Sequence, residues 1–298
     1  MHESLSALPW CTWLIIGTTC VVSFRGFRSF GFEEKYIFNP EAILAGKQYY
    51  RLVSSAFLHA DIRHLMLNML SLFFFGRGVE LTLGSAEFLL IYFGAVVGGD
   101  LLSLYVHRHH EYRSYGASGG VCGIIFASIL VNPGGAISLF YFPIGIPNWL
   151  YAIGFLLASF YGMKEQNRGD IGHDAHLGGA IIGFGITAAL NPEYVRYSPR
   201  IFAIVLVASI ALLVYLWVNP LFLPVSAFSG GLPWRKQGKK AQTPRYKRES
   251  AEMDAVLEKI SKNGIQSLTA EEKKLLGEVS GKYQRRADSS KPKSGLAI

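Results

Sequence analysis

The residues best suited to chemistry interrupt otherwise apolar segments of the chain. Ser118 stands between glycines at the start of one segment, and His176 enters another. His64 and Asn68 lie four residues apart on one face of a third segment, with His59 near its start. A serine becomes a nucleophile when a histidine removes its proton, and N–H donors can stabilise the oxyanion formed in acyl transfer. These residue types therefore indicate acyl-transfer chemistry at a site sunk in a membrane.

Each position also has a purely structural interpretation. The Ser118 hydroxyl can bond back to a carbonyl one turn earlier, as serines in apolar helices do. Asn68 can join two helices, and His176 can lie at the level of the lipid headgroups. Only the combination of a nucleophile, a base and oxyanion donors favours a catalytic site.

The elements that carry these residues are long apolar stretches separated by Gly, Pro and charged clusters. Half of the 298 residues are apolar, and a membrane span needs about 20 mainly apolar residues. The sequence therefore predicts an all-α polytopic membrane protein. Its apolar stretches are Leu8–Phe24, Ile62–Phe75, Phe88–Val106, Ala117–Val131, Trp149–Tyr161, Leu177–Leu190 and Ile201–Leu223.

The order of the spans brings the polar residues together. Ser118 and His176 lie near the starts of the fourth and sixth stretches, and Asn68 lies about a turn into the second. Even-numbered spans cross the membrane in the same direction. We therefore expect all three side chains on one side of the bilayer and at similar depth.

With these motifs in this order, the chain resembles the rhomboid intramembrane serine proteases over about residues 8–192. Any one of the motifs is weak, but three in the right order and spans are specific. The motifs are Gly116-Ala117-Ser118-Gly119, then His59, His64 and Asn68 at the second span, and Ala175-His176 followed by Gly179 and Gly183. Arg51 and Glu80 also fit the family's pattern.

The resemblance implies a six-span helical bundle and a role for each motif residue. Ser118 would be the nucleophile and His176 the general base, in a dyad without a third acid. His64, Asn68 and the backbone N–H of Ser118 would form the oxyanion hole, with His59 supporting the site. Gly116 and Gly119 would permit the tight backbone there, and Gly179 and Gly183 would let the fourth and sixth spans touch.

Three positions bear on how the histidine is held. Asp174 is only two residues from His176, so it points to another face of a helix, and we interpret it as a helix-start acid in a loop or cap. Cys122 occupies a position where the best-known bacterial members carry an aromatic that stacks on the histidine. Tyr50 precedes Arg51 where a tryptophan is common.

No metal and no cofactor is expected. The run His107–Arg113 holds three closely spaced histidines, but we interpret them as solvated loop residues because no Cys or carboxylate stands at ligand spacing. His173 and His176 are three residues apart, not the four of a zinc-protease helix.

The resemblance implies an intramembrane serine endopeptidase in the bacterial inner membrane that cleaves single-span or polytopic membrane proteins in or beside their spans. The alternative is a catalytically inactive rhomboid-like protein that binds and directs client proteins. A channel or transporter is disfavoured because the polar groups gather at one depth.

The C-terminal part follows the predicted core, residues 1–192, in two segments. Residues 193–228 hold a further apolar segment, a candidate seventh span, and residues 229–298 form a basic linker and a helical hairpin. Residues 229–298 carry 16 Lys and Arg against 8 Asp and Glu, which equals the net charge of +8 for the whole chain. Such a tail is attracted to anionic lipids, and no nucleic-acid-binding module accompanies it.

The side of the membrane on which the tail lies follows from two opposed arguments. Seven full crossings from a cytoplasmic N-terminus would put the tail outside. Dense Lys and Arg beside a span favour the cytoplasm. We predict a cytoplasmic tail, which requires a re-entrant last segment or a different count of spans.

Overall fold

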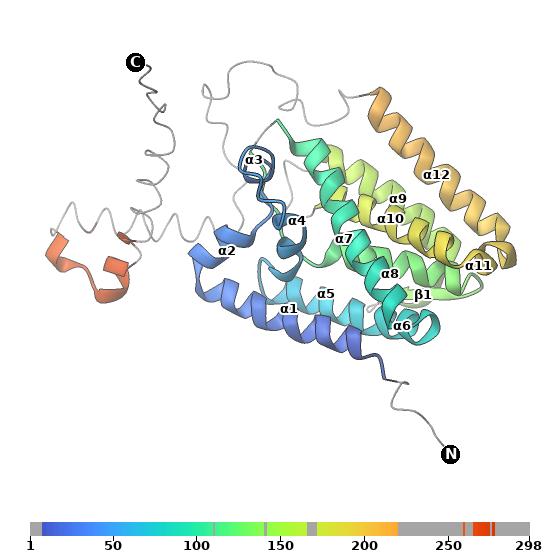
Figure 1. Cartoon of the computed structure of the whole chain (residues 1–298), viewed down its shortest axis with the longest axis horizontal. Helices are drawn as coiled ribbons and strands as arrows, with labels where there is room; N and C mark the ends of the chain where they lie inside the picture. The colour runs from blue at the N-terminus through green and yellow to red at the C-terminus, as the bar shows by residue number, and fades with distance from the viewer. Residues whose placement is uncertain are drawn as a thin grey trace, which may run out of the picture. The chain divides into compact units, whose positions relative to one another are not determined.

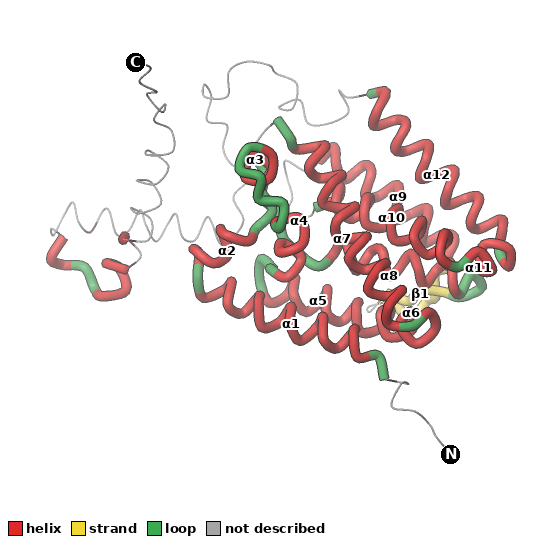
Figure 2. Tube along the Cα trace, in the orientation of Figure 1, coloured by secondary structure: helices red, strands yellow, loops and turns green. Residues whose placement is uncertain are grey.

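The computed structural model describes residues 8–109, 111–139, 142–165, 172–219, 259, 265–274 and 276–277. The chain divides into two compact units, Met1–Ala241 and Gln242–Ile298. Helices make up nearly all of the described part of the first unit, which also contains a small two-stranded sheet (Figure 2).

Figure 1 shows the helices and strands of the first unit in chain order. They are α1 (Trp10–Arg28), α2 (Phe30–Tyr36), α3 (Pro40–Leu44), α4 (Arg51–Ser54), η2 (Ser55–Phe57), α5 (Ile62–Ser71), the π-helical turn η3 (Leu72–Gly76), α6 (Arg77–Leu83), α7 (Ser85–His107), α8 (Ser118–Val131), β1 (Ala136–Leu139), β2 (Phe142–Pro147), α9 (Asn148–Glu165), α10 (His173–Leu190), α11 (Pro192–Tyr197) and α12 (Pro199–Val218).

Within the described residues, four helical stretches are long and apolar enough to cross a membrane. They are α1, the continuous stretch α5–η3–α6 (Ile62–Leu83), α7 and α12. The chain is therefore a polytopic membrane protein. The other predicted spans coincide with helices that fall short by length or hydropathy: α8 has 14 residues, and α10 begins with three polar residues in its first turn.

The helices α7, α8 and α10 pack most extensively against one another. Between α8 and α10 the two backbones touch: a methyl group built on Gly179 would overlap the backbone of Gly119, and one built on Gly183 would overlap that of Gly123. Glycines at four-residue spacing allow this approach because they have no side chain to separate the helices. The contact holds the helix that carries the serine against the helix that carries the histidine.

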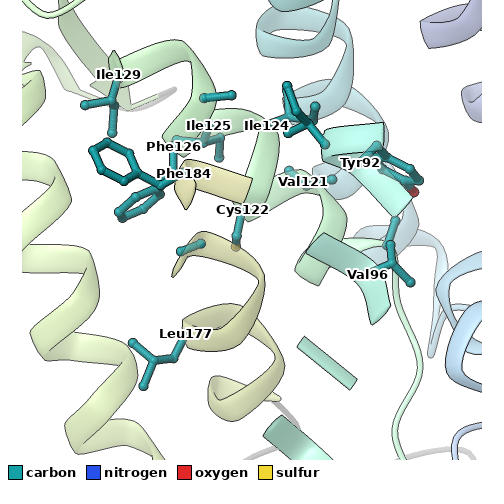
Figure 3. Close-up of a cluster of buried hydrophobic side chains, with 14 of the residues drawn as sticks. Tyr92, Val96, Val121, Cys122, Ile124, Ile125, Phe126, Ile129, Leu177 and Phe184 are labelled. Atoms are coloured by element: carbon teal, nitrogen blue, oxygen red, sulfur yellow. The ribbon is translucent and has the colours of Figure 1, made fainter. Parts of the chain in front are cut away.

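Apolar side chains from the same three helices fill the surrounding core. Figure 3 shows Tyr92 and Val96 of α7, Cys122 of α8, and Leu177 and Phe184 of α10 in this cluster. Residues 119–127 of α8 are all buried, and a helix that is apolar and buried all round lies inside a bundle. The helix is about 21 Å long, shorter than the roughly 30 Å hydrocarbon core.

The connection between the first and second spans contains α2, α3, α4 and η2. The buried Arg51 ties it together: Nη1 donates to the carbonyl oxygens of Glu34 (2.9 Å) and Ile37 (2.6 Å), and Nε donates to Gln48 Oε1 (2.7 Å). The charge of the guanidinium is thus met by backbone and amide oxygens, which stabilises a loop lying against the bundle.

Glu80 joins α6 to the start of α1. Its carboxylate accepts from the backbone N–H groups of Cys11 (2.9 Å) and Thr12 (2.8 Å), from Thr12 Oγ1 (2.7 Å) and from Ser85 Oγ (2.7 Å). The first N–H groups of a helix have no partner within it, so a buried carboxylate there satisfies them. The residue therefore fixes the ends of three helices.

The segment between α8 and α9 is an antiparallel hairpin of β1 and β2, in which Ala136 pairs with Pro147 and Leu139 with Phe142. In the second unit, Thr269 and Glu272 form a reciprocal capping box: Thr269 N donates to Glu272 Oε2 (2.7 Å) and Glu272 N to Thr269 Oγ1 (3.3 Å). The basic linker and most of the predicted first helix of the tail lie outside the described residues.

Candidate active site

Ser118 is the first residue of α8 and follows a backbone that only glycine adopts readily. Gly116 has a φ of +140°, and its N–H donates to the carbonyl oxygen of Ser55 (3.1 Å). Ser118 itself is half-buried, whereas its neighbours Ala117 and Gly119 are buried. The local geometry therefore presents the serine at the end of a buried helix, where a reacting group can approach it.

The His64 ring lies beside this loop. A methyl group built on Gly116 would lie 2.9 Å from His64 Cε1, 3.0 Å from His64 Nε2 and 3.7 Å from Ser118 Oγ. The imidazole of α5 and the hydroxyl of α8 thus flank the same small volume over Gly116. The absence of a side chain at residue 116 leaves that volume open.

Asn68 lies one turn further along α5 and is buried. Its Nδ2 donates to the carbonyl oxygen of His64 (3.0 Å), and the N-terminus of the helix is capped by Asp61, whose carboxylate accepts from the N–H groups of Arg63 and His64. The side chain shares the face of His64, but its amide bonds within its own helix in this structure.

His59 lies in the loop between η2 and α5 and connects three segments. Its Nε2 accepts from the N–H of Ala117 (3.3 Å), and Nδ1 lies 3.0 Å from Ser23 Oγ, which donates to the carbonyl oxygen of Phe57 (2.9 Å). This pattern assigns the proton to Nδ1, because Nε2 acts as an acceptor. Burial, together with the nearby His64, lowers the pKa of His59 to about 3. The ring is therefore neutral and acts as a fixed link, its centroid 4.9 Å from that of His64.

His176 lies in the first turn of α10 and is half-buried. Its N–H donates to the carbonyl oxygen of Gly172 (3.0 Å). The ring lies 6.1 Å from that of His173 and 6.3 Å from that of Phe155 on α9, centroid to centroid. The residue before it also reaches α8, since a methyl group built on Gly119 would lie 3.4 Å from the Ala175 carbonyl oxygen. The residues adjoining the serine and the histidine are thus in contact.

Cys122 is buried one turn after Ser118, with its side chain in the core (Figure 3). A phenyl ring near His176 comes instead from Phe155, which is tilted by 32° to the imidazole and stacks on Tyr151. Sequence reasoning missed this contact, because the spacing of residues on α9 gives no indication of what they face across the bundle.

Two polar residues lie elsewhere than predicted. His107 is not a solvated loop histidine: it ends α7, is 2 % exposed, and its Nε2 lies 2.9 Å from Oδ2 of Asp174. Asp174 does lie at the start of a helix, in the first turn of α10, but Gly172 is the cap and the carboxylate is fully buried. The expectation of an exposed histidine was wrong because α7 extends to residue 107 and turns this side chain inward.

The described residues contain no group of three His, Cys, Asp or Glu side chains that could hold a metal ion. Two polar residues of the core had not been singled out from the sequence, Ser55 and Asp100. Ser55 Oγ donates to Asp100 Oδ2 (2.8 Å). An acid in the middle of an apolar stretch was the signal that could have drawn attention to Asp100.

Comparison with known proteins identifies the relatives of both units. A family model described as the Rhomboid domain matches residues 46–193, and one described as a family of unknown function (DUF6576) matches residues 243–282. The chain is 29% identical over 156 residues to "Rhomboid protein 1, mitochondrial" of Saccharomyces cerevisiae, covering 51% of this chain and 44% of that protein. It is 31% identical over 147 residues to "RHOMBOID-like protein 12, mitochondrial" of Arabidopsis thaliana, covering 44% of this chain and 43% of that protein.

A bacterial relative is similar over a longer stretch. The chain is 33% identical over 171 residues to "Rhomboid protease GluP" of Bacillus subtilis, covering 57% of this chain and 32% of that protein. The similarity therefore spans less than half the length of each of these three relatives.

Proposed function

The chain belongs to the rhomboid family, and we propose that it is an intramembrane serine endopeptidase that uses Ser118 and His176. Its substrates are single-span or polytopic membrane proteins, cut in or beside their transmembrane segments. We place it in the bacterial inner membrane as a multi-pass protein, although some of its relatives are mitochondrial.

One observation carries the proposal: the start of α8 meets the imidazole of α5 and the first turn of α10 at a single point. A methyl group built on Gly116 would lie close to both the His64 ring and the Ser118 hydroxyl, and one built on Gly119, next to Ser118, would lie 3.4 Å from the carbonyl oxygen of Ala175, next to His176. Because α8 is too short to fill the hydrocarbon core, this point lies below the membrane surface if the helix reaches the opposite face. A nucleophile below the membrane surface, with one imidazole close by and a second on a helix packed against its own, suits hydrolysis of a peptide bond within the bilayer.

Each residue has a defined step in the reaction. His176 takes the proton of the Ser118 hydroxyl as Oγ attacks the substrate carbonyl, and returns it to the amine that leaves. The Ser118 N–H with His64 and Asn68 stabilises the oxyanion, and water then hydrolyses the acyl-enzyme. The Asn68 amide must turn away from the His64 carbonyl to donate to the oxyanion. In sites without substrate, catalytic hydrogen bonds are often not yet formed.

The proposal also fixes the organisation of the chain. Residues 1–192 form the six-span core, in which α8, α9 and α10 cross together with α1, α5–α6 and α7. Residues 193–228 add α12, and residues 229–298 form a tail that contacts anionic lipid. Neither a cofactor nor nucleic acid has a part in this function.

The test compares the wild-type protein with Ser118→Ala and His176→Ala in lipid vesicles that also contain a single-span model substrate. We expect cleavage by the wild type only, with all three proteins showing the same thermal unfolding midpoint in detergent. Labelling of Ser118 by a fluorophosphonate gives a second readout that needs no substrate. Cleavage that persists in either folded variant would sink the dyad, and substrate capture without cleavage by the wild type would favour the inactive client-binding alternative.

A further inference from the structure

The helix α7 carries three buried polar residues within an apolar span. Asp100, Ser103 and His107 are 8 %, 0 % and 2 % exposed, and their spacing of three and four residues puts them on one face. Polar side chains inside a span are costly unless they are paired or serve the site. None of the three belongs to the reaction proposed above.

The first of them reaches the loop before the serine. Asp100 Oδ2 accepts from Ser55 Oγ (2.8 Å), and the Ser55 carbonyl oxygen accepts from the N–H of Gly116 (3.1 Å). Gly116 is two residues before Ser118. Two consecutive hydrogen bonds therefore link the middle of α7 to the strained backbone that presents the nucleophile.

The last of them reaches the helix of the base. His107 Nε2 lies 2.9 Å from Asp174 Oδ2, and the His107 ring stacks on Tyr112, 3.5 Å between centroids and 7° from parallel. The two atoms lie within ion-pair distance, and both side chains are removed from solvent. Asp174 is two residues before His176, on another face of the same helical turn.

Between these two links, α7 and α10 touch through their backbones. A methyl group built on Gly99 would lie 2.5 Å from the Ala175 carbonyl oxygen, and one built on Gly178 would lie 2.9 Å from the Gly98 carbonyl oxygen. The two helices therefore cannot slide past each other without separating. The helix α7 is therefore closely packed and has polar contacts on both sides of the site, so it can hold the site residues in fixed positions.

We propose that Asp100 and His107 of α7 are positioning residues that set the placement of Ser118 and His176, acting through Ser55 and Asp174. The inference rests on the proposed protease function. Neither α7 residue contacts the reacting atoms: His107 lies against Asp174, two residues before His176, and Asp100 reaches Gly116, two residues before Ser118, through Ser55. Loss of a link displaces a catalytic side chain while leaving the surface that meets the substrate unchanged. The effect is therefore expected in kcat and not in KM.

The test uses a matched pair of substitutions at each acid. Asp100→Leu and Asp174→Leu remove the link, whereas Asp100→Asn and Asp174→Asn retain an oxygen that accepts in the same place. We expect the Leu variants to lower kcat by about 10- to 100-fold with KM unchanged, the scale of a misplacement of about 1 Å, and the Asn variants to cleave at close to the wild-type rate.

Two further variants separate positioning from stability. Asp174→Leu leaves His107 buried without its carboxylate, so the double variant His107→Leu/Asp174→Leu replaces the whole pair with apolar groups, a change that buried pairs often tolerate. We expect it to unfold at the wild-type midpoint and still have the low kcat. Thr187→Val is the control, because Thr187 is a buried polar residue of α10 whose Oγ1 bonds only to Gly183 of its own helix (2.8 Å). It should cleave as the wild type does.

The outcomes are distinct from those of the proposed function. Cleavage by the wild type but not by Ser118→Ala establishes the protease activity. The positioning roles are tested separately, by comparing the kcat values of the α7 and α10 variants with one another. Three results would each overturn the inference. They are equal kcat in the Leu and Asn variants, a change in KM alone, and a wild-type kcat in the folded double variant. Failure of the double variant to fold would overturn it as well, since the pair would then serve the stability of the bundle.

Discussion

At the scale of single residues, the site depends on one glycine and one neutral histidine. Gly116 combines a positive φ with the approach of the His64 ring, so a side chain there would meet both backbone strain and a steric clash. His59 accepts a hydrogen bond from the N–H of Ala117, one residue before Ser118, and lies 3.0 Å from Ser23 Oγ on α1. Both residues shape the backbone of the Ser118 loop without taking part in proton transfer.

We predict that Gly116→Ala lowers kcat by about 100-fold, the scale of one lost oxyanion donor. The methyl group would lie 2.9 Å from His64 Cε1, so the imidazole must move away from Ser118. Gly84→Ala is the matched control, because Gly84 also has a positive φ (87°) but nothing within 4 Å of its added methyl group. Both variants should lose stability on the order of 1–3 kcal/mol. Equal activity of the two in a vesicle cleavage assay would contradict the role of His64.

We predict that His59 makes the fold sensitive to acid. Its pKa in the folded protein is about 3, against 6.5 for the free side chain. Between pH 6.5 and pH 3, His59 is protonated in the unfolded chain but neutral in the folded chain. The free energy of unfolding therefore decreases over this range as the pH falls, by up to about 1.4 kcal/mol per pH unit. The unfolding midpoint in detergent should drop from pH 7.5 to pH 4.5, and His59→Gln should drop less. An identical loss in both proteins would assign the sensitivity to other groups.

At the scale of elements, close backbone contact decides how the helices are arranged. The glycines of α8 and α10 remove the side chains that would otherwise separate the two helices. The pairing therefore depends on shape, and it tolerates no added volume at the contact. Elsewhere on the same helix the surface is open, so substitutions on the two faces of α10 are expected to have opposite effects.

The pair Gly179→Ala and Gly185→Ala tests this difference. The added methyl group would overlap the Gly119 backbone at residue 179, whereas at residue 185 it meets nothing within 4 Å. We expect Gly179→Ala to destabilise the protein by about 1–3 kcal/mol or more and to abolish cleavage. Gly185→Ala should stabilise it by about 0.5–1 kcal/mol, since alanine favours the helix. Comparable unfolding midpoints for the two variants would show that α8 and α10 do not meet as described.

At the scale of the whole molecule, α12 changes the expected topology. The predicted cytoplasmic tail required a re-entrant last segment or a different count of spans. Residues 199–218 form one continuous helix of 20 residues, about 30 Å long, with most of its residues exposed. Such a helix is long enough to cross the hydrocarbon core and presents an apolar surface to lipid. With the six crossings proposed above before it, a full crossing would put the basic tail on the side of the membrane to which Ser118 is expected to open.

We therefore expect a cysteine placed at Ser250 to react with an impermeant reagent from outside intact cells, in a background where Cys11, Cys20 and Cys122 are replaced. The matched control is Gly134→Cys in the turn between α8 and β1, where an added side chain meets nothing within 4 Å. Since α8 runs inward from Ser118, this control should react only after the cells are permeabilised. Protection of the Ser250→Cys variant in intact cells would restore the cytoplasmic tail and would require a different number of crossings.

The sequence by itself determined the features that depend on local pattern. Apolar runs predicted helices at every expected span, and the motifs around Ser118 and His176 identified the family, because each lies within a few residues of chain. The capping box of Thr269 and Glu272 was likewise readable, since its two hydrogen bonds join residues three apart. The end of the last apolar helix follows the same local rule, because Val218 directly precedes Asn219-Pro220 and proline does not continue a helix.

Only the tertiary structure decided which side chains meet across the bundle. His107 and Asp174 are 67 positions apart, and no spacing rule shows that the last turn of one helix faces the first turn of another. The same holds for Ser55 with Asp100, and for Phe155, which supplies the ring near His176 that Cys122 cannot. The physical reason is that helical periodicity fixes the face on which a residue lies. Helix rotation and crossing, set by glycine contacts and core packing, fix what that face meets.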